Sequence, residues 1–211
     1  MLGTRKQLEI RHLASANGSL IGPPLVTRTL SSMGIVVNAL WLSVIVAAGL
    51  SAAMTFKNVP PLEPVIADYE SLDQATRSRI VAGLITGPTF EVADLVQWVL
   101  APLLIIILII QRASNPRLHR NLISWISTCS ILAASLIFMA RSLWLNPIMN
   151  SDLERYRAAA RAGDSELVRT TYEIFDRWHV LAENLWGLVG LLLLISLACL
   201  GAMVPSRSSL R

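Results

Sequence analysis

The chain contains only two cysteines and three histidines among its 211 residues. Cys129 and Cys199 both fall within long apolar stretches and form no C-x-x-C pattern, so neither a disulfide framework nor a thiolate metal site is expected. The sequence also lacks a Walker loop, a G-x-S-x-G elbow, an H-E-x-x-H motif and a dinucleotide-binding fingerprint. The sequence motifs therefore give little support to a hydrolase or to a nucleotide-driven activity.

What the chain has in abundance is hydrophobic residues, which make up 54% of it and gather in four stretches about as long as a bilayer core requires. The second stretch contains a run from Val99 to Ile110 with no polar or charged residue, and Pro102 lies within this run. Backbone N–H and C=O groups must be paired within hydrocarbon, so these stretches are expected to be helices. The sequence predicts an all-α polytopic membrane protein, a four-transmembrane-helix bundle with short extramembrane helices.

The predicted domain organisation is one membrane domain with a tail at each end. The tails are residues 1–32 and 205–211, and the membrane domain is residues 33–204. Its expected spans are residues 33–55, 92–111, 122–145 and 178–204. Its structured outer loops are residues 56–91 and 146–177.

Basic residues are densest in the tails and in the short connection between the second and third spans, which together hold a single acidic residue, Glu9. The positive-inside rule then places both termini in the cytoplasm, with the protein in the plasma membrane of a bacterial cell. The net charge of +4 is explained by this topology, so the lipid bilayer and not nucleic acid is the expected partner. A cleaved signal peptide competes for the first span, because Ser51-Ala52-Ala53 offers small residues, but the apolar run is longer than a signal core and favours an uncleaved anchor.

Capping patterns predict helices in both outer loops. The sequence from Ser71 to Gln74 resembles a capping box and predicts a helix over 72–85 that ends at Gly87-Pro88, before the second span, which Pro102 should kink. A second capping box, from Ser151 to Glu154, predicts a helix that ends at Gly163. Asp164 or Ser165 should then cap a helix that continues into the fourth span.

The proposed topology places four ionisable residues at similar depths in the outer third of the bundle: Asp94, Arg141, His179 and Glu183. A charge within hydrocarbon costs roughly 2.5–3.5 kcal/mol on insertion scales, so such residues usually face a partner or a cavity. Three hydrogen-bonding side chains are expected beside them: Gln97, Asn146 and Asn184.

Three interpretations of this polar cluster stay open. Arg141 pairs with Glu183 or Asp94 in a structural salt bridge that sets the order of the helices. Alternatively, His179 and Glu183, four residues apart on one helical face, bind a divalent metal whose ligand set is completed by Asp94, Glu91 or Asp176. In the third interpretation the cluster lines a polar vestibule in which His179 relays protons or Arg141 contacts an anionic substrate. No other cofactor is predicted.

The six tryptophans are expected mainly to form an aromatic belt at the membrane boundaries. Glycines at 187 and 190 should permit close approach of the fourth helix to a neighbour.

Several segments resemble a four-span family of bacterial and eukaryotic membrane proteins that is catalogued as a domain of unknown function. The similar segments span about residues 33–204 and include Asn38-Ala39-Leu40-Trp41-Leu42, Thr55-Phe56-Lys57-Asn58-Val59-Pro60-Pro61, Arg141-Ser142-Leu143-Trp144-Leu145-Asn146-Pro147-Ile148-Met149 and Phe175-Asp176-Arg177-Trp178-His179. The resemblance marks Arg141, Asn146, Pro147 and His179, and departs at Ser43, where glycine is expected. It implies no established activity, although the animal member of the family is associated with drug resistance.

These observations predict a non-enzymatic four-helix module that scaffolds, or associates with, other membrane components or further copies of itself. The alternative is a small transporter or a metal-binding membrane protein that works through the polar cluster. An enzyme would have to use these same side chains, and their spacing specifies no reaction.

Overall fold

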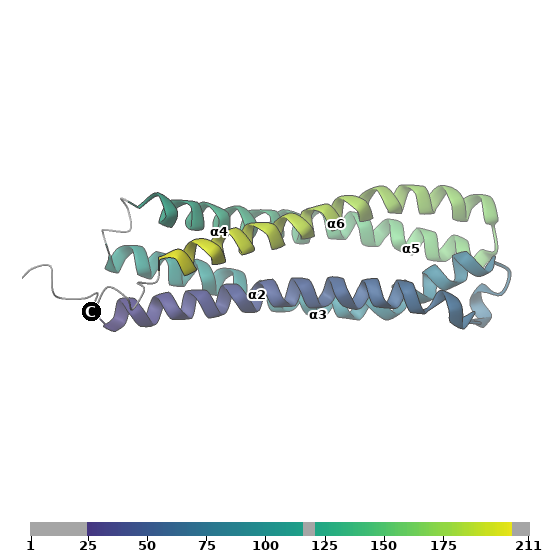
Figure 1. The fold of residues 1–211 in the computed structure, drawn as a ribbon. Helices are drawn as coiled ribbons and strands as arrows, with labels where there is room; N and C mark the ends of the chain where they lie inside the picture. Colours follow the sequence, from purple (N-terminus) through teal and green to yellow (C-terminus); the bar gives the residue numbers. More distant parts are fainter. Residues whose placement is uncertain (1–24, 116–120, 204–211) are drawn as a thin grey trace, which may run out of the picture.

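The computed structural model describes residues 25–115 and 121–203 and contains no strand within those two segments. Four long helical rods dominate it (Figure 1). The elements in chain order are α2 (Leu25–Asn58), η1 (Pro60–Leu62), η2 (Ala67–Tyr69), α3 (Gln74–Ser114), α4 (Leu122–Ala140), η4 (Arg141–Leu145), α5 (Asn146–Ala162) and α6 (Ser165–Ala202). The rods are long and apolar enough to cross a membrane, which confirms the predicted all-α four-helix architecture.

The rods are much longer than a bilayer core is thick. The 41 residues of α3 and the 38 of α6 correspond to about 60 Å of helix, against a hydrocarbon core of about 30 Å. The surplus lies at one end of the bundle, which we call the cap and define as residues 59–90 and 146–177. At the opposite end, which we call the termini end, α2 begins and α6 finishes (Figure 1).

The order of helices around the bundle follows from their contacts. α2 packs against both α3 and α6, and α6 also packs against α4 and α5. α3 and α4, although consecutive in the chain, contact each other only sparsely. The side chains that bury against one another in the spanning part are Val37, Trp41, Ile45, Ala101, Leu104, Ile107, Leu108, Ile131, Ala134, Phe138, Val189 and Leu193.

Large apolar side chains also cover the outside of the spanning part. Leu95, Ile109 and Leu136 are each exposed over at least 60% of their surface. A water-soluble protein rarely presents so much contiguous apolar surface, whereas a bilayer solvates it. The chain is therefore a multi-pass membrane protein whose helices contact lipid.

The cap has a small core of its own. It buries seven side chains from η2, α3, α5, α6 and the turn before α3: Tyr69, Leu72, Ile80, Tyr156, Ala159, Ala160 and Val168. Gly163 ends α5 with a φ of 70°, a left-handed conformation that glycine adopts without strain, as the sequence predicts for this position. The side chain of Asp164 accepts from the N–H of Leu167 at 3.0 Å and starts α6, also as predicted.

Two predicted helix boundaries are wrong. α3 starts after Asp73, whose carboxylate caps Thr76, and it continues through Gly87-Pro88 without a break. Gly87 has no Cβ to clash with the proline ring, which removes one of the reasons for a helix to stop before proline. α5 starts at Asn146 and not at the Ser151 capping box, so the third span and the outer helix form one rod.

A glycine on α2 tests the packing of α2 against α3. A Cβ at Gly34 would lie 3.0 Å from Nε2 of Gln111, whose side chain donates to the carbonyl of Leu30 at 2.7 Å. We expect Gly34→Leu to lower the free energy of unfolding by about 1–3 kcal/mol through overpacking. The matched control is Gly49→Leu, because a Cβ at Gly49 has no neighbour within 4 Å. Unfolding in mixed detergent micelles, followed by circular dichroism, measures both; equal losses would contradict this packing.

A tyrosine in the cap should make stability depend on alkaline pH. Burial raises the pKa of Tyr156 from 10.0 to about 12. Between these two values the folded protein keeps a proton that the unfolded chain has lost, so stability must fall as the pH rises. We expect Tyr156→Phe to flatten this decline without a loss of stability at neutral pH, because the hydroxyl is buried without a hydrogen-bond partner. Unfolding curves measured across that pH range would contradict the assignment if the two proteins declined equally.

Candidate functional site

The most distinctive group of side chains in the bundle is an ion pair between α3 and the α4–α5 junction. Arg141 donates from Nη2 to Oδ1 of Asp94. The Arg141 side chain is only 6% exposed and that of Asp94 is 19% exposed. Of the two partners that the sequence offered to Arg141, the structure selects Asp94 and not Glu183. Because a buried guanidinium without its carboxylate would be very costly, the pair joins the two rods firmly.

Asn146 is the second donor to this carboxylate. Its Nδ2 lies 2.9 Å from Oδ2 of Asp94. Asn146 and Arg141 are five residues apart, a spacing that on an α-helix would separate their side chains by about 140°. The chain brings them together with a π-helical turn over Arg141–Leu145, closed by a bond from the N–H of Asn146 to the carbonyl of Arg141.

The sequence explains why the wide turn occurs here. Pro147 has no N–H to donate to the carbonyl of Leu143, and its ring crowds that carbonyl. Proline is a common cause of a kink or a local widening in an α-helix, and this helix widens. Pro147 thereby aims both Arg141 and Asn146 at the same carboxylate.

Gln97 and Trp41 extend the group to α2. Gln97, one turn after Asp94 on α3, donates from Nε2 to Oδ1 of Asp94 at 3.2 Å. Its Oε1 accepts from the indole N–H of Trp41 at 3.0 Å. Trp41 is fully buried, so the prediction that it belongs to a boundary belt is wrong. We call Asp94, Gln97, Arg141 and Asn146 the clasp, and through Trp41 it connects three rods.

The fourth rod reaches the clasp through an aromatic ring. The guanidinium carbon of Arg141 lies 4.3 Å from the ring centroid of Trp186 on α6, a cation–π distance. The indole N–H of Trp186 donates to the carbonyl of Ile45 on α2 at 3.3 Å. Its ring also meets Phe90 edge-on, with 5.3 Å between centroids. Trp186 therefore places an aromatic ring against the Arg141 cation.

Charge spacing along α3 locates the clasp relative to a bilayer. The next charged residue after Asp94 on α3 is Arg112, eighteen positions and about 27 Å further along the helix. This span nearly equals the thickness of a hydrocarbon core. Asp94 and Arg112 therefore mark opposite boundaries of the spanning part of α3, and the clasp sits at the boundary nearer the cap.

The structure separates the other predicted cluster members from the clasp. His179 pairs with Glu183 on α6 at 3.2 Å, and its ring stacks on Phe175 with 5.3 Å between centroids. The side chain of Glu183 is 67% exposed, and Asn184 is exposed as well. Both carry their polar groups on the outside of the rod. The four ionisable residues that were expected to meet therefore form two pairs. Asp94 pairs with Arg141, and His179 pairs with Glu183.

The proposed metal ligands do not assemble in the described segments. No group of three or more His, Cys, Asp or Glu side chains there could hold a metal ion. The physical reason is that the carboxylates are already engaged: Asp94 accepts from the clasp, and Asp176 accepts from the hydroxyl of Tyr172 at 3.0 Å. His179, Glu183, Asp94 and Asp176 do not come together as one such group in the described segments.

A second polar layer, nearer the termini end, was not predicted. Asn38 of α2 donates from Nδ2 to the hydroxyl of Ser196 on α6 at 3.0 Å, and that hydroxyl lies 2.9 Å from the hydroxyl of Ser127 on α4. Each of these residues looks unremarkable in an apolar span, and only the packing shows that they meet. The layer connects α2, α4 and α6 by neutral hydrogen bonds.

Comparisons with protein-family models, with curated proteins and with solved structures found no match for this chain. The resemblance to the four-span family of unknown function stays a prediction. The site must therefore be interpreted from its own geometry.

A double-mutant cycle tests the clasp. We expect Asp94→Leu and Arg141→Met each to lower the free energy of unfolding by about 3–5 kcal/mol, because each strands a buried polar partner. The double variant should be more stable than either single variant, since no charge is left unpaired. The control is Glu183→Gln, whose exposed pair with His179 should contribute under about 1 kcal/mol and should add independently to Arg141→Met. Strictly additive losses for Asp94 and Arg141 would refute the pairing.

Proposed function

We propose that this protein is a non-enzymatic four-helix membrane module that scaffolds, or associates with, other membrane components. We place it in a bacterial plasma membrane with both termini in the cytoplasm. The supporting observation is that both charged groups of the clasp are engaged within the protein. Asp94 accepts from Arg141, Gln97 and Asn146, and the guanidinium of Arg141 is paired with Asp94 and lies against the ring of Trp186.

Charged groups that are already engaged within the protein favour a structural role over transport. A transport or proton-relay site needs a charged group that can exchange partners as its cargo passes. In the clasp, exchange would leave a buried guanidinium or carboxylate unsatisfied, at a cost of several kcal/mol. The clasp instead holds α2, α3 and the α4–α5 rod in one arrangement.

The cap gives the module a surface beyond the bilayer. Its own buried core joins α3, α5 and α6 and keeps it in line with the spanning helices. A rigid projection of this kind suits association with other proteins, because little conformational entropy is lost when a preorganised surface binds.

The experiment compares the wild type with the charge-free double variant that combines Asp94→Leu and Arg141→Met. In native membranes solubilised with mild detergent, we expect both proteins to migrate in assemblies larger than one chain. In liposomes loaded with a pH-sensitive dye, we expect both to give the same proton flux as empty liposomes.

Three results would contradict this proposal. The first is a proton flux that the wild type supports and the folded double variant does not. The second is stoichiometric zinc, copper or iron in the purified wild type that disappears in His179→Ala. A chain that stays monomeric in every mild detergent would also contradict association.

A further inference from the structure

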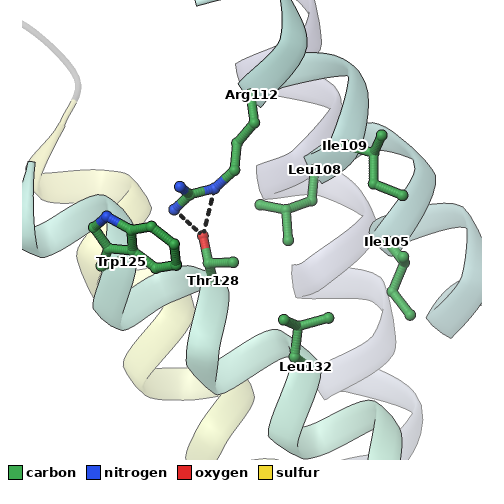
Figure 2. A pocket seen from close by; sticks show the side chains of 7 residues that line it. All are labelled: Ile105, Leu108, Ile109, Arg112, Trp125, Thr128 and Leu132. Carbon is green, nitrogen blue, oxygen red and sulfur yellow. Dashed lines mark hydrogen bonds between the residues drawn. The ribbon is translucent and has the colours of Figure 1, made fainter. Parts of the chain in front are cut away.

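A crevice of about 300 Å³ opens between α3 and α4 near the termini end, where these two helices contact each other sparsely (Figure 2). Its volume is at the lower limit of ordinary ligand pockets. The surface of the crevice is apolar, and the two polar residues among those that line it, Arg112 and Thr128, lie at one end. The lining residues are Ile105, Leu108, Ile109, Arg112, Trp125, Thr128 and Leu132.

Arg112 closes the polar end of the crevice and is held there by α4. Its Nε and Nη2 donate to the hydroxyl of Thr128 at 3.2 and 2.6 Å, and Nη2 also donates to the carbonyl of Ser124 at 3.2 Å. The guanidinium carbon lies 4.2 Å from the ring centroid of Trp125. Figure 2 shows the guanidinium between Trp125 and Thr128, at the head of the apolar lining. These contacts hold the guanidinium at this end of the crevice.

One donor of this guanidinium is unused. Nη1 of Arg112 is buried and has no hydrogen-bond partner among the described residues. An unmet buried donor on a charged group is costly, and a phosphate oxygen is the acceptor that matches a guanidinium fork best. A small outward turn of the side chain would present Nη1 to an acceptor at the mouth of the crevice.

The surrounding charge is of one sign. Every acidic residue in the described segments lies within 63–94 or 152–183, at the cap or at the clasp. The described part of the termini end therefore contains no carboxylate to pair with Arg112. The sequence that follows adds Arg117 and Arg120 before the next helix and no acid. Among the described residues, no acidic side chain balances this positive charge.

The depth of the residues identifies the anion as a lipid. Arg112 is two residues from the end of α3 and Trp125 is in the first turn of α4, so both lie at the level of lipid headgroups. Ile105 and Leu132 lie seven residues deeper on their helices, about 10 Å toward the bilayer centre. A molecule that fills the crevice must combine an anionic head with an apolar chain.

We propose that this crevice binds an anionic phospholipid, with its phosphate at Arg112 and one acyl chain between α3 and α4. The site is independent of the proposed scaffold function, because it uses none of the clasp residues. The lipid phosphate at Arg112 neutralises the local positive charge. The acyl chain of the lipid covers Leu108 and Leu132 in the crevice between α3 and α4.

The test is native mass spectrometry of the full chain in detergent with phosphatidylglycerol or phosphatidylcholine added. We expect the wild type to retain phosphatidylglycerol preferentially. Arg112→Gln should weaken this retention roughly tenfold or more, the effect of losing one charge-assisted hydrogen bond. Leu132→Trp should abolish it by filling the apolar half of the crevice.

Two control variants keep the test specific. Leu136→Trp adds the same bulk to α4 at a side chain that is 67% exposed and does not line the crevice, so binding should persist. Arg112→Lys retains the charge without the planar fork and should keep the preference for phosphatidylglycerol with weaker binding. It also provides the measurement if Arg112→Gln does not fold.

Either of two results would overturn the phospholipid site. One is equal retention of the two lipids by the wild type, unchanged in Arg112→Gln and Leu132→Trp. The other is thermal stabilisation by inorganic phosphate alone that survives Leu132→Trp, which would identify a headgroup-sized anion site without an acyl chain.

Discussion

The burial of the Arg141 charge is the constraint on which the rest of the bundle depends. The Arg141 guanidinium is buried between the helices, with its side chain only 6% exposed, so its partners must come from within the protein. Asp94 must therefore face it from α3, and Asp94 in turn orients Gln97 and Asn146. Gln97 engages Trp41 of α2, and Trp186 of α6 covers the cation. One buried charge thus relates all four rods.

Backbone geometry serves the same constraint. Pro147 widens the helix into a π-turn, and the turn rotates Asn146 onto the face of Arg141. The two charged boundaries of α3 are treated differently. At the cap boundary the charge of Arg141 is balanced by Asp94 within the chain, whereas at the termini end Arg112 meets only hydroxyls, a carbonyl and an aromatic ring among the described residues. At the first boundary the protein supplies the counter-charge, whereas at the second none of the described residues supplies one.

The parts of the structure that follow local rules could be predicted from the sequence. Gly163 and Asp164 end one helix and begin the next because a left-handed glycine and an N-capping carboxylate act on their immediate neighbours. The break at Gly87-Pro88 was wrong because glycine relieves the clash that normally precedes proline. Trp41 was assigned to the belt because its residue type suits either a boundary or a core, and only its neighbours decide.

The sequence by itself determined that four apolar helices lie in a membrane and that Asp94, Gln97, Arg141 and Asn146 are too polar to face lipid. These properties depend on the length and polarity of each segment, which need no partner to be read. Only the tertiary structure decided that Arg141 pairs with Asp94, that His179 and Glu183 stand apart, and that Asn38 meets Ser127 and Ser196. Such contacts depend on the order of the helices around the bundle and on the rotation of each helix about its axis. The hydropathy of a span is the same for every order and rotation, so it cannot predict these contacts.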